Sequence, residues 1–171
     1  LIYLAEEGAA RAKNLTRETR QILDAFNQSY RFGVIDEVFW PAEILLNATP
    51  PYEPVSGELS IVGPSRVLTF GPYMHLPAGE WTADYAFETL DNGSGNLYCF
   101  DVVTDGAIQF STQGLINSSG KFLISCDFEV TEPASPVEFR CFIAEGAIGG
   151  RLTPLGVTVR RRAEDKSSQA A

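Results

Sequence analysis

The chain has 171 residues, which is enough for one domain with a substantial core. Hydrophobic residues make up 44% of it, with 11 Phe, 6 Tyr and 2 Trp, a composition typical of a folded globular protein and not of a disordered one. The formal net charge of −9 repels phosphate backbones and excludes nucleic acid as the expected partner, and no apolar run approaches the roughly 20 residues of a membrane span.

The first predicted element is an amphipathic helix between about residues 5 and 29. Apolar and small residues recur there at three- and four-residue spacing, and most charged residues fall elsewhere. The recurring residues are Ala12, Leu15, Thr19, Ile22, Leu23, Phe26 and Tyr30. Gly33 is expected to cap the C-terminus of the helix. The helix either covers one side of a β-domain or mediates self-association or contact with a neighbouring domain.

Proline-rich sequence follows, and residues 34–55 are predicted to be an irregular linker that wraps the domain. Trp40 precedes Pro41 and is therefore held extended, so its ring is expected either to plug the end of a sandwich or to lie on a surface. The predicted organisation is a helix at 1–33, the linker at 34–55, a β-domain at 56–161 and a disordered tail at 162–171. Because the chain begins at Leu1 and not at Met, we expect a fragment, a processed chain or a piece of a larger polypeptide.

The β-domain is predicted to be all-β, an antiparallel β-sandwich of jelly-roll type. Strands are expected at 57–62, 66–73, 80–90, 96–104, 107–112, 121–131, 136–144 and 156–161. Period-two alternation is clear in three of them and assigns an inward face to each. The inward residues are Trp81, Ala83, Tyr85 and Phe87, then Phe122, Ile124, Cys126, Phe128 and Val130, then Val137, Phe139, Cys141 and Ile143.

The strand at 96–104 departs from this alternation, because it is apolar on both faces. Tyr98 and Phe100 occupy one face, and Leu97 and Cys99 occupy the other. We expect a central strand whose second face is packed under the N-terminal helix or a loop. An aromatic platform for a ligand would leave the same pattern.

Catalytic signatures are absent from the sequence. His75 is the only histidine, and no nucleophile motif, phosphate-binding glycine loop or dinucleotide fingerprint accompanies it. The chain is therefore expected not to be an enzyme. No cofactor is expected, although the oxygen-rich segments 91–95 and 101–105 leave structural calcium open.

The three cysteines lie inside strand patterns and lack metal-type spacing, so we expect buried free thiols, with one disulfide and a spare thiol as the alternative if the protein is exported. With no signal-like start, they favour a cytoplasmic location over secretion.

The stretch Phe70-Gly-Pro-Tyr-Met-His-Leu-Pro-Ala-Gly-Glu-Trp81 carries a resemblance. It is similar to a phrase in bacterial carbohydrate-binding-module-like β-sandwich domains, in which Gly-Pro-Tyr and Leu-Pro-Ala-Gly precede a strand with alternating aromatics. Domains of this kind are often appended to glycosyltransferases or other polysaccharide-related enzymes. The resemblance covers roughly residues 56–161, although its specific part is about 15 residues long and matches no binding motif beyond the turn.

The resemblance implies a non-catalytic module that binds a glycan or a polysaccharide. Sugar binding needs exposed aromatic faces and planar polar groups, and the candidates are Tyr73, His75, Trp40, Tyr98, Asn92 and Asn96, with Tyr73 and His75 first. The alternative is a structural domain that holds a second copy or an upstream domain through the N-terminal helix.

Overall fold

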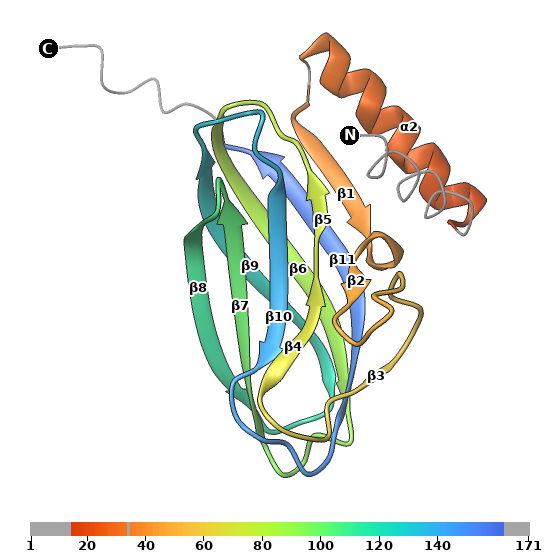
Figure 1. The fold of residues 1–171 in the computed structure, drawn as a ribbon, viewed down its shortest axis with the longest axis vertical. Helices are drawn as coiled ribbons and strands as arrows, with labels where there is room; N and C mark the ends of the chain where they lie inside the picture. Colours follow the sequence, from red (N-terminus) through yellow and green to blue (C-terminus); the bar gives the residue numbers. More distant parts are fainter. Residues whose placement is uncertain (1–14, 34, 163–171) are drawn as a thin grey trace, which may run out of the picture.

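The computed structural model describes residues 15–33 and 35–162, which form a helix and two antiparallel β-sheets. The sheets stack as the two layers of a β-sandwich, which confirms the predicted fold class (Figure 1). The helices are α2 (Arg17–Phe32) and the short 3-10 helix η1 (Ala42–Ile44). The strands are β1 (Glu37–Pro41), β2 (Leu46–Asn47), β3 (Leu59–Ser60), β4 (Arg66–Phe70), β5 (Pro72–Met74), β6 (Gly79–Leu90), β7 (Asn96–Thr104), β8 (Ala107–Ile116), β9 (Gly120–Val130), β10 (Val137–Ile143) and β11 (Arg151–Arg161).

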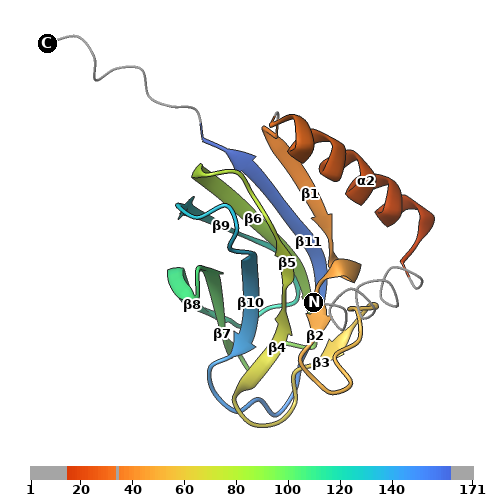
Figure 2. The same ribbon diagram turned by 45° about the horizontal axis from the view of Figure 1, so that its top comes forward.

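The chain passes repeatedly from one sheet to the other. One sheet has the order β1-β11-β6-β9, with β3 paired to β11, and the other has the order β2-β4-β10-β7-β8, with β5 paired to β10. We call the second the front sheet, because it faces the viewer in Figure 1, and the first the rear sheet. Figure 2 shows the two layers separately, with α2 alongside β1 of the rear sheet.

The core lies between the sheets and is built from the inward faces that the alternation predicts. Trp81, Ala83, Tyr85 and Phe87 on β6 are at most 4% exposed, and the ring of Phe87 stacks on that of Phe122 with centroids 5.6 Å apart. From β10, the inward residues Val137, Phe139, Cys141 and Ile143 are buried against them. Each large apolar side chain buried in this way contributes about 1.5–3 kcal/mol to the stability of the fold.

Helix α2 is set by caps at both ends. The hydroxyl of Thr16 accepts a hydrogen bond from the backbone N–H of Thr19 at 3.2 Å, and Gly33 ends the helix in the left-handed conformation with its N–H donating to Tyr30 O, which confirms the predicted cap. Phe26 anchors the helix, because its ring meets that of Trp40 edge to face at 5.9 Å. The predicted helical residues 5–14 lie outside the described residues.

The segment predicted as an irregular linker supplies strands to both sheets, since β1 pairs with β11 and β2 pairs with β4. On β1 the residues alternate: Val38 and Trp40 are buried, whereas Glu37 and Phe39 are exposed. Strand β1 tolerates Pro41 because it lies at the edge of its sheet, where a missing backbone N–H leaves no partner strand unpaired.

The second face of β7 is not covered by the helix, which packs against β1 of the other sheet. Cys99, Asp101 and Val103 nevertheless are only 6–8% exposed on this outer face. Their cover comes from side chains of the flanking strands, such as Ser111 on β8 and Arg140 on β10. The outer face of the front sheet is therefore an open surface with a polar pair at its centre.

Candidate functional site

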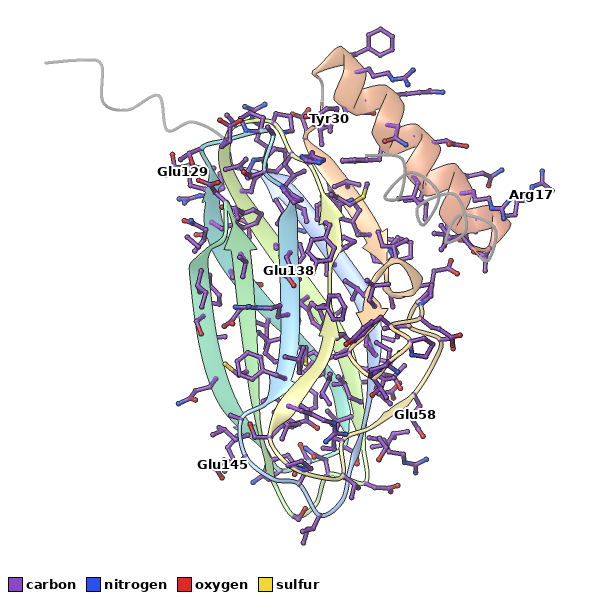
Figure 3. The ribbon with its side chains drawn as sticks, in the orientation of Figure 1. Arg17, Tyr30, Glu58, Glu129, Glu138 and Glu145 are labelled. Carbon is purple, nitrogen blue, oxygen red and sulfur yellow. The ribbon has the colours of Figure 1, made fainter. Side chains whose placement is uncertain are left out.

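The outer face of the front sheet gathers aromatic and charged side chains from several strands. We call it the front surface, and its members are Val67, Phe70 and Tyr73 on β4 and β5, Leu97, Cys99, Asp101 and Val103 on β7, Ser111, Gln113 and Leu115 on β8, and Glu138, Arg140 and Phe142 on β10, together with Tyr52 from the loop after β2. Figure 3 shows Glu138 near the middle of the face that β10 turns towards the viewer. The surface is continuous across five paired strands.

Three aromatic rings cluster at the β4–β5 side of this surface. Phe70 lies between Tyr52 and Tyr73, with ring centroids 5.9 and 6.1 Å away and both pairs edge to face. The two tyrosines are 48% and 42% exposed, so their rings meet solvent. Rings that are held by one another and open on one side provide apolar faces for a ligand.

Both tyrosines of this cluster have left-handed backbone conformations, with φ of 63° at Tyr52 and 61° at Tyr73. Bulky L-residues rarely adopt positive φ, and each such residue costs on the order of 1–3 kcal/mol. Strain of this kind concentrates at ligand sites, where it sets the direction of a side chain. The exposed rings are therefore positioned by the backbone and are not incidental surface residues.

An ion pair lies beside the aromatic cluster. Arg140 Nη2 donates to Asp101 Oδ2 at 2.7 Å across the β7–β10 pairing, and the two side chains are 30% and 6% exposed. Phe70 of β4 follows Thr69, the residue opposite Cys141, so Phe70 lies opposite Arg140 of the neighbouring strand β10. Among the buried side-chain polar atoms of the described residues, Asp101 Oδ1 and Arg140 Nε are two of the three that lack a hydrogen-bond partner. Such atoms cost free energy until a partner or a water reaches them.

A second polar group borders the same rings. The hydroxyl of Tyr73 donates to Glu138 Oε1 at 2.9 Å, two residues along β10 from Arg140. A carboxylate and a guanidinium, both planar, therefore stand on one strand beside three aromatic rings. This combination suits a ligand with apolar C–H faces and several hydroxyl groups.

The structure separates the six residues that sequence reasoning proposed as ligand contacts. Tyr73 lies on the front surface, and exposed His75 follows it, with Nδ1 3.2 Å from Pro133 O. Trp40 and Tyr98 are 0% exposed in the core, where Trp40 packs between Phe26 and Phe139. These two rings present no face to a ligand. Of the two positions expected for Trp40, the structure excludes the surface one, because the ring is buried.

Asn92 and Asn96 are also buried, at 0% and 5% exposure, and form a polar network with Tyr98. The Tyr98 hydroxyl donates to Asn92 Oδ1 at 3.2 Å, and Asn96 Nδ2 donates to the same oxygen and to Gly149 O. Asn92 Nδ2 donates to Ile116 O at 2.6 Å. These amides connect the β6–β7 turn to the end of β8 and to the loop between β10 and β11, and the candidate surface does not include them.

The acidic segments considered for calcium make other contacts. Asp91 pairs with Arg151, and Asp101 pairs with Arg140. Within residues 15–33 and 35–162, no group of three or more His, Cys, Asp or Glu side chains is placed to hold a metal ion. The same part of the chain contains no helix long and apolar enough to cross a membrane.

The three cysteines are free and buried. Burial raises the pKa of the Cys126 thiol to about 12 and raises the pKa of Cys141 and Cys99 above the ordinary value. These thiols are therefore protonated and unreactive at neutral pH.

Sequence reasoning missed the centre of the front surface. Glu138 and Arg140 alternate with the inward residues of β10, and Asp101 lies on the outer face of β7, but their proximity depends on β10 pairing with β7. Local periodicity does not determine which strands pair when they are almost 40 residues apart in the sequence. Tyr52 and Phe70 carried no signal beyond their aromatic character.

Comparisons with known proteins found matches of fold. No family model and no curated protein matches the chain. Solved structures that match include the carbohydrate-binding module TmCBM61 in complex with beta-1,4-galactotriose, at 13% identity and a TM-score of 0.44 over 69% of this chain and 81% of that one. A CBM36-1 domain of a multidomain xylanase from the hindgut metagenome of Trinervitermes trinervoides matches at 10% identity and a TM-score of 0.44, over 75% of this chain and 99% of that chain.

A carbohydrate-binding module from Cellvibrio mixtus lichenase 5A, in complex with cellotriose, matches at 11% identity and a TM-score of 0.41 over 75% of this chain and all of that chain. Carbohydrate-binding modules thus recur among the structures to which this chain is similar. These identities and TM-scores are too low to transfer a ligand or a site from any of them. The front surface is identified as a candidate site from its own geometry alone.

Proposed function

We propose that this chain is a non-catalytic module that binds a glycan on the front surface. The observation that carries the proposal is the aromatic cluster of Tyr52, Phe70 and Tyr73, in which two exposed rings are held at positive φ on either side of a third. The axial C–H groups of a pyranose ring form an apolar face that packs on such rings. Residues held in sparsely populated backbone conformations concentrate at ligand sites, which agrees with a role for these two rings in binding.

The polar groups beside the cluster supply the second requirement of sugar recognition. Arg140 donates and Glu138 accepts, so the hydroxyls of one sugar ring can be matched in both senses. Asp101 fixes the guanidinium from below, because its carboxylate is almost fully buried and contacts Arg140 at 2.7 Å. The Arg140 side chain is 30% exposed, so its accessible guanidinium N–H groups can donate to a ligand hydroxyl.

The same geometry supports binding without catalysis. Hydrolysis of a glycoside needs two carboxyl groups that flank the scissile bond. Asp101 is 6% exposed beneath Arg140, and Glu138 accepts the Tyr73 hydroxyl, so this pair does not present two carboxyl groups to one bond. Their role in the proposal is to orient Arg140 and to accept ligand hydroxyls.

The test is a screen of neutral oligosaccharides and soluble polysaccharides by glycan array, followed by isothermal titration calorimetry with the best ligand. Tyr73→Ala is expected to weaken binding at least tenfold, which corresponds to about 1.4 kcal/mol of binding free energy. Phe39→Ala is the matched control, because Phe39 is 43% exposed on the rear sheet and Tyr73 is 42% exposed on the front one.

Binding by the wild-type chain that survives in Phe39→Ala and is lost in Tyr73→Ala supports the proposal. Absence of binding to every saccharide would overturn it. Equal loss in the two variants would place the ligand elsewhere and would also contradict it.

A further inference from the structure

The outermost strand of the front sheet, β8, is an unusual edge. Edge strands expose unpaired N–H and C=O groups, and proteins normally protect them with charges, prolines or short length. The other ends of the sheets follow this rule: β2 has two residues, β9 carries Lys121, Asp127 and Glu129, and β1 is flanked by α2. Strand β8 is ten residues long, and the whole stretch from 106 to 120 contains no Asp, Glu, Lys or Arg.

This uncharged edge is also apolar and exposed. Ile108 is 57% exposed and Leu115 is 69% exposed, and both lie on the outer face, opposite Val103 and Leu97 of β7. On the inner face, Phe110, Thr112 and Ile116 line a groove of about 370 Å³ that opens between β8 and β9. Figure 1 shows β8 at the side of the sandwich, with no strand of the described chain beyond it.

We propose that β8 pairs with β8 of a second copy of this chain, joining two front sheets edge to edge in an antiparallel two-fold dimer. A second copy meets this edge with a strand that is equally long and equally uncharged, so β8 against β8 brings no like charges together. The net charge of −9 opposes contact between two copies over most of the remaining surface.

The sequence of β8 is self-complementary in one register. With Thr112 opposite Thr112 of the other copy, Ser111 faces Gln113 and Phe110 faces Gly114. The β7–β8 pairing skips Gln109, because Val102 faces Phe110 and Val103 faces Ile108. With the same skip, Ile108 of each copy falls opposite Leu115 of the other, so the two most exposed apolar residues of the strand cover one another.

The same register fills the groove beside β8. Inward residues of the second copy's strand continue the inner face of the sheet, and they would lie over the half-buried Phe122 and Ile124 of β9. A ten-residue antiparallel pair forms roughly ten backbone hydrogen bonds. The dimer would also place two front surfaces side by side on one continuous sheet, which would let a polymeric ligand bind two sites at once.

The experiment measures the mass of the full chain by sedimentation velocity across a range of concentrations. The expected result is a monomer–dimer equilibrium in the wild-type chain. The double variant Ile108→Lys with Leu115→Lys places lysine opposite lysine and is expected to be monomeric, whereas Ile108→Lys with Leu115→Glu pairs opposite charges and is expected to dimerise. Ile148→Lys, at an 89% exposed residue of the loop between β10 and β11, is the control outside the paired strand that leaves the dimer intact.

A cysteine at the two-fold position tests the register. Cα atoms opposite one another in an antiparallel pair lie about 4.5–5.5 Å apart, within the range that a disulfide spans. Thr112→Cys is therefore expected to form a covalent dimer on mild oxidation, and Ile148→Cys is expected not to. A monomer at every concentration, or a dimer that persists in the double-lysine variant, would overturn the proposal without affecting the proposed glycan site.

Discussion

Removal of the Arg140 guanidinium should destabilise the fold far more than removal of a comparable arginine on the opposite sheet. In the Arg140→Ala variant, Asp101 loses its ion pair while its carboxylate stays 6% exposed, and its Oδ1 atom already lacks a partner. Loss of one member of a buried ion pair typically costs 3–5 kcal/mol. Arg140 is 30% exposed, so water can replace part of the interaction, and we expect a loss of about 3 kcal/mol.

The matched control is Arg160→Ala on the outer face of the rear sheet. Arg160 pairs with Asp84, but that carboxylate also accepts a hydrogen bond from Ser125 and therefore keeps a partner. Arg160 is 43% exposed, and we expect a loss of no more than about 1 kcal/mol.

Urea denaturation measures both losses, and a thermal scan should show the Arg140→Ala midpoint lower by roughly 6–12 °C. The double variant Asp101→Leu with Arg140→Met removes both charges and should recover most of the stability, because an apolar pair of similar size has no buried charge to compensate. Equal losses in Arg140→Ala and Arg160→Ala would refute the view that Asp101 depends on its partner.

Three further predictions concern other parts of the chain. Asn92→Ala should cost about 2–4 kcal/mol of unfolding free energy, because the Tyr98 hydroxyl and two further buried partners lose their hydrogen bonds, and calorimetry should show unchanged glycan affinity. Gly156→Ala should destabilise by about 2 kcal/mol or more in the same denaturation assay, since φ is 127° and a Cβ would lie 2.6 Å from the Phe39 ring. Cys126 should resist a thiol reagent at pH 8 until the chain unfolds. Its pKa is about 12 in the folded chain against an ordinary 9.0, so the unfolded chain loses the thiol proton first and the free energy of unfolding should fall as pH rises above 9. Early labelling, or a free energy of unfolding that stays constant from pH 9 to 11, would contradict this.

The fold followed from local patterns wherever alternation and turn chemistry agreed. The inward series from Trp81 to Phe87 lies in the core, and Gly33 caps the helix as expected. Strand β1 was missed because Pro41 and the prolines after it suggested an irregular segment, yet an edge strand tolerates a proline.

The candidate site was only partly predictable. Tyr73 was selected because it is an aromatic residue on the strand that enters a turn, and it lies on the front surface. Its partners Glu138 and Arg140 come from β10, which local sequence does not place beside β5 and β7. The amides of Asn92 and Asn96 have turn-like neighbours in sequence, but both are buried, because the two amide nitrogens and the Asn92 oxygen have hydrogen-bond partners inside the fold.

The most direct test of a glycan site on the front surface is an NMR titration of the isotopically labelled chain with the best saccharide from the screen. Backbone amide shifts are expected to change along β4, β5 and the part of β10 around Arg140, together with the loop that carries Tyr52. Shift changes confined to the rear sheet, or none at saturating saccharide, would contradict it.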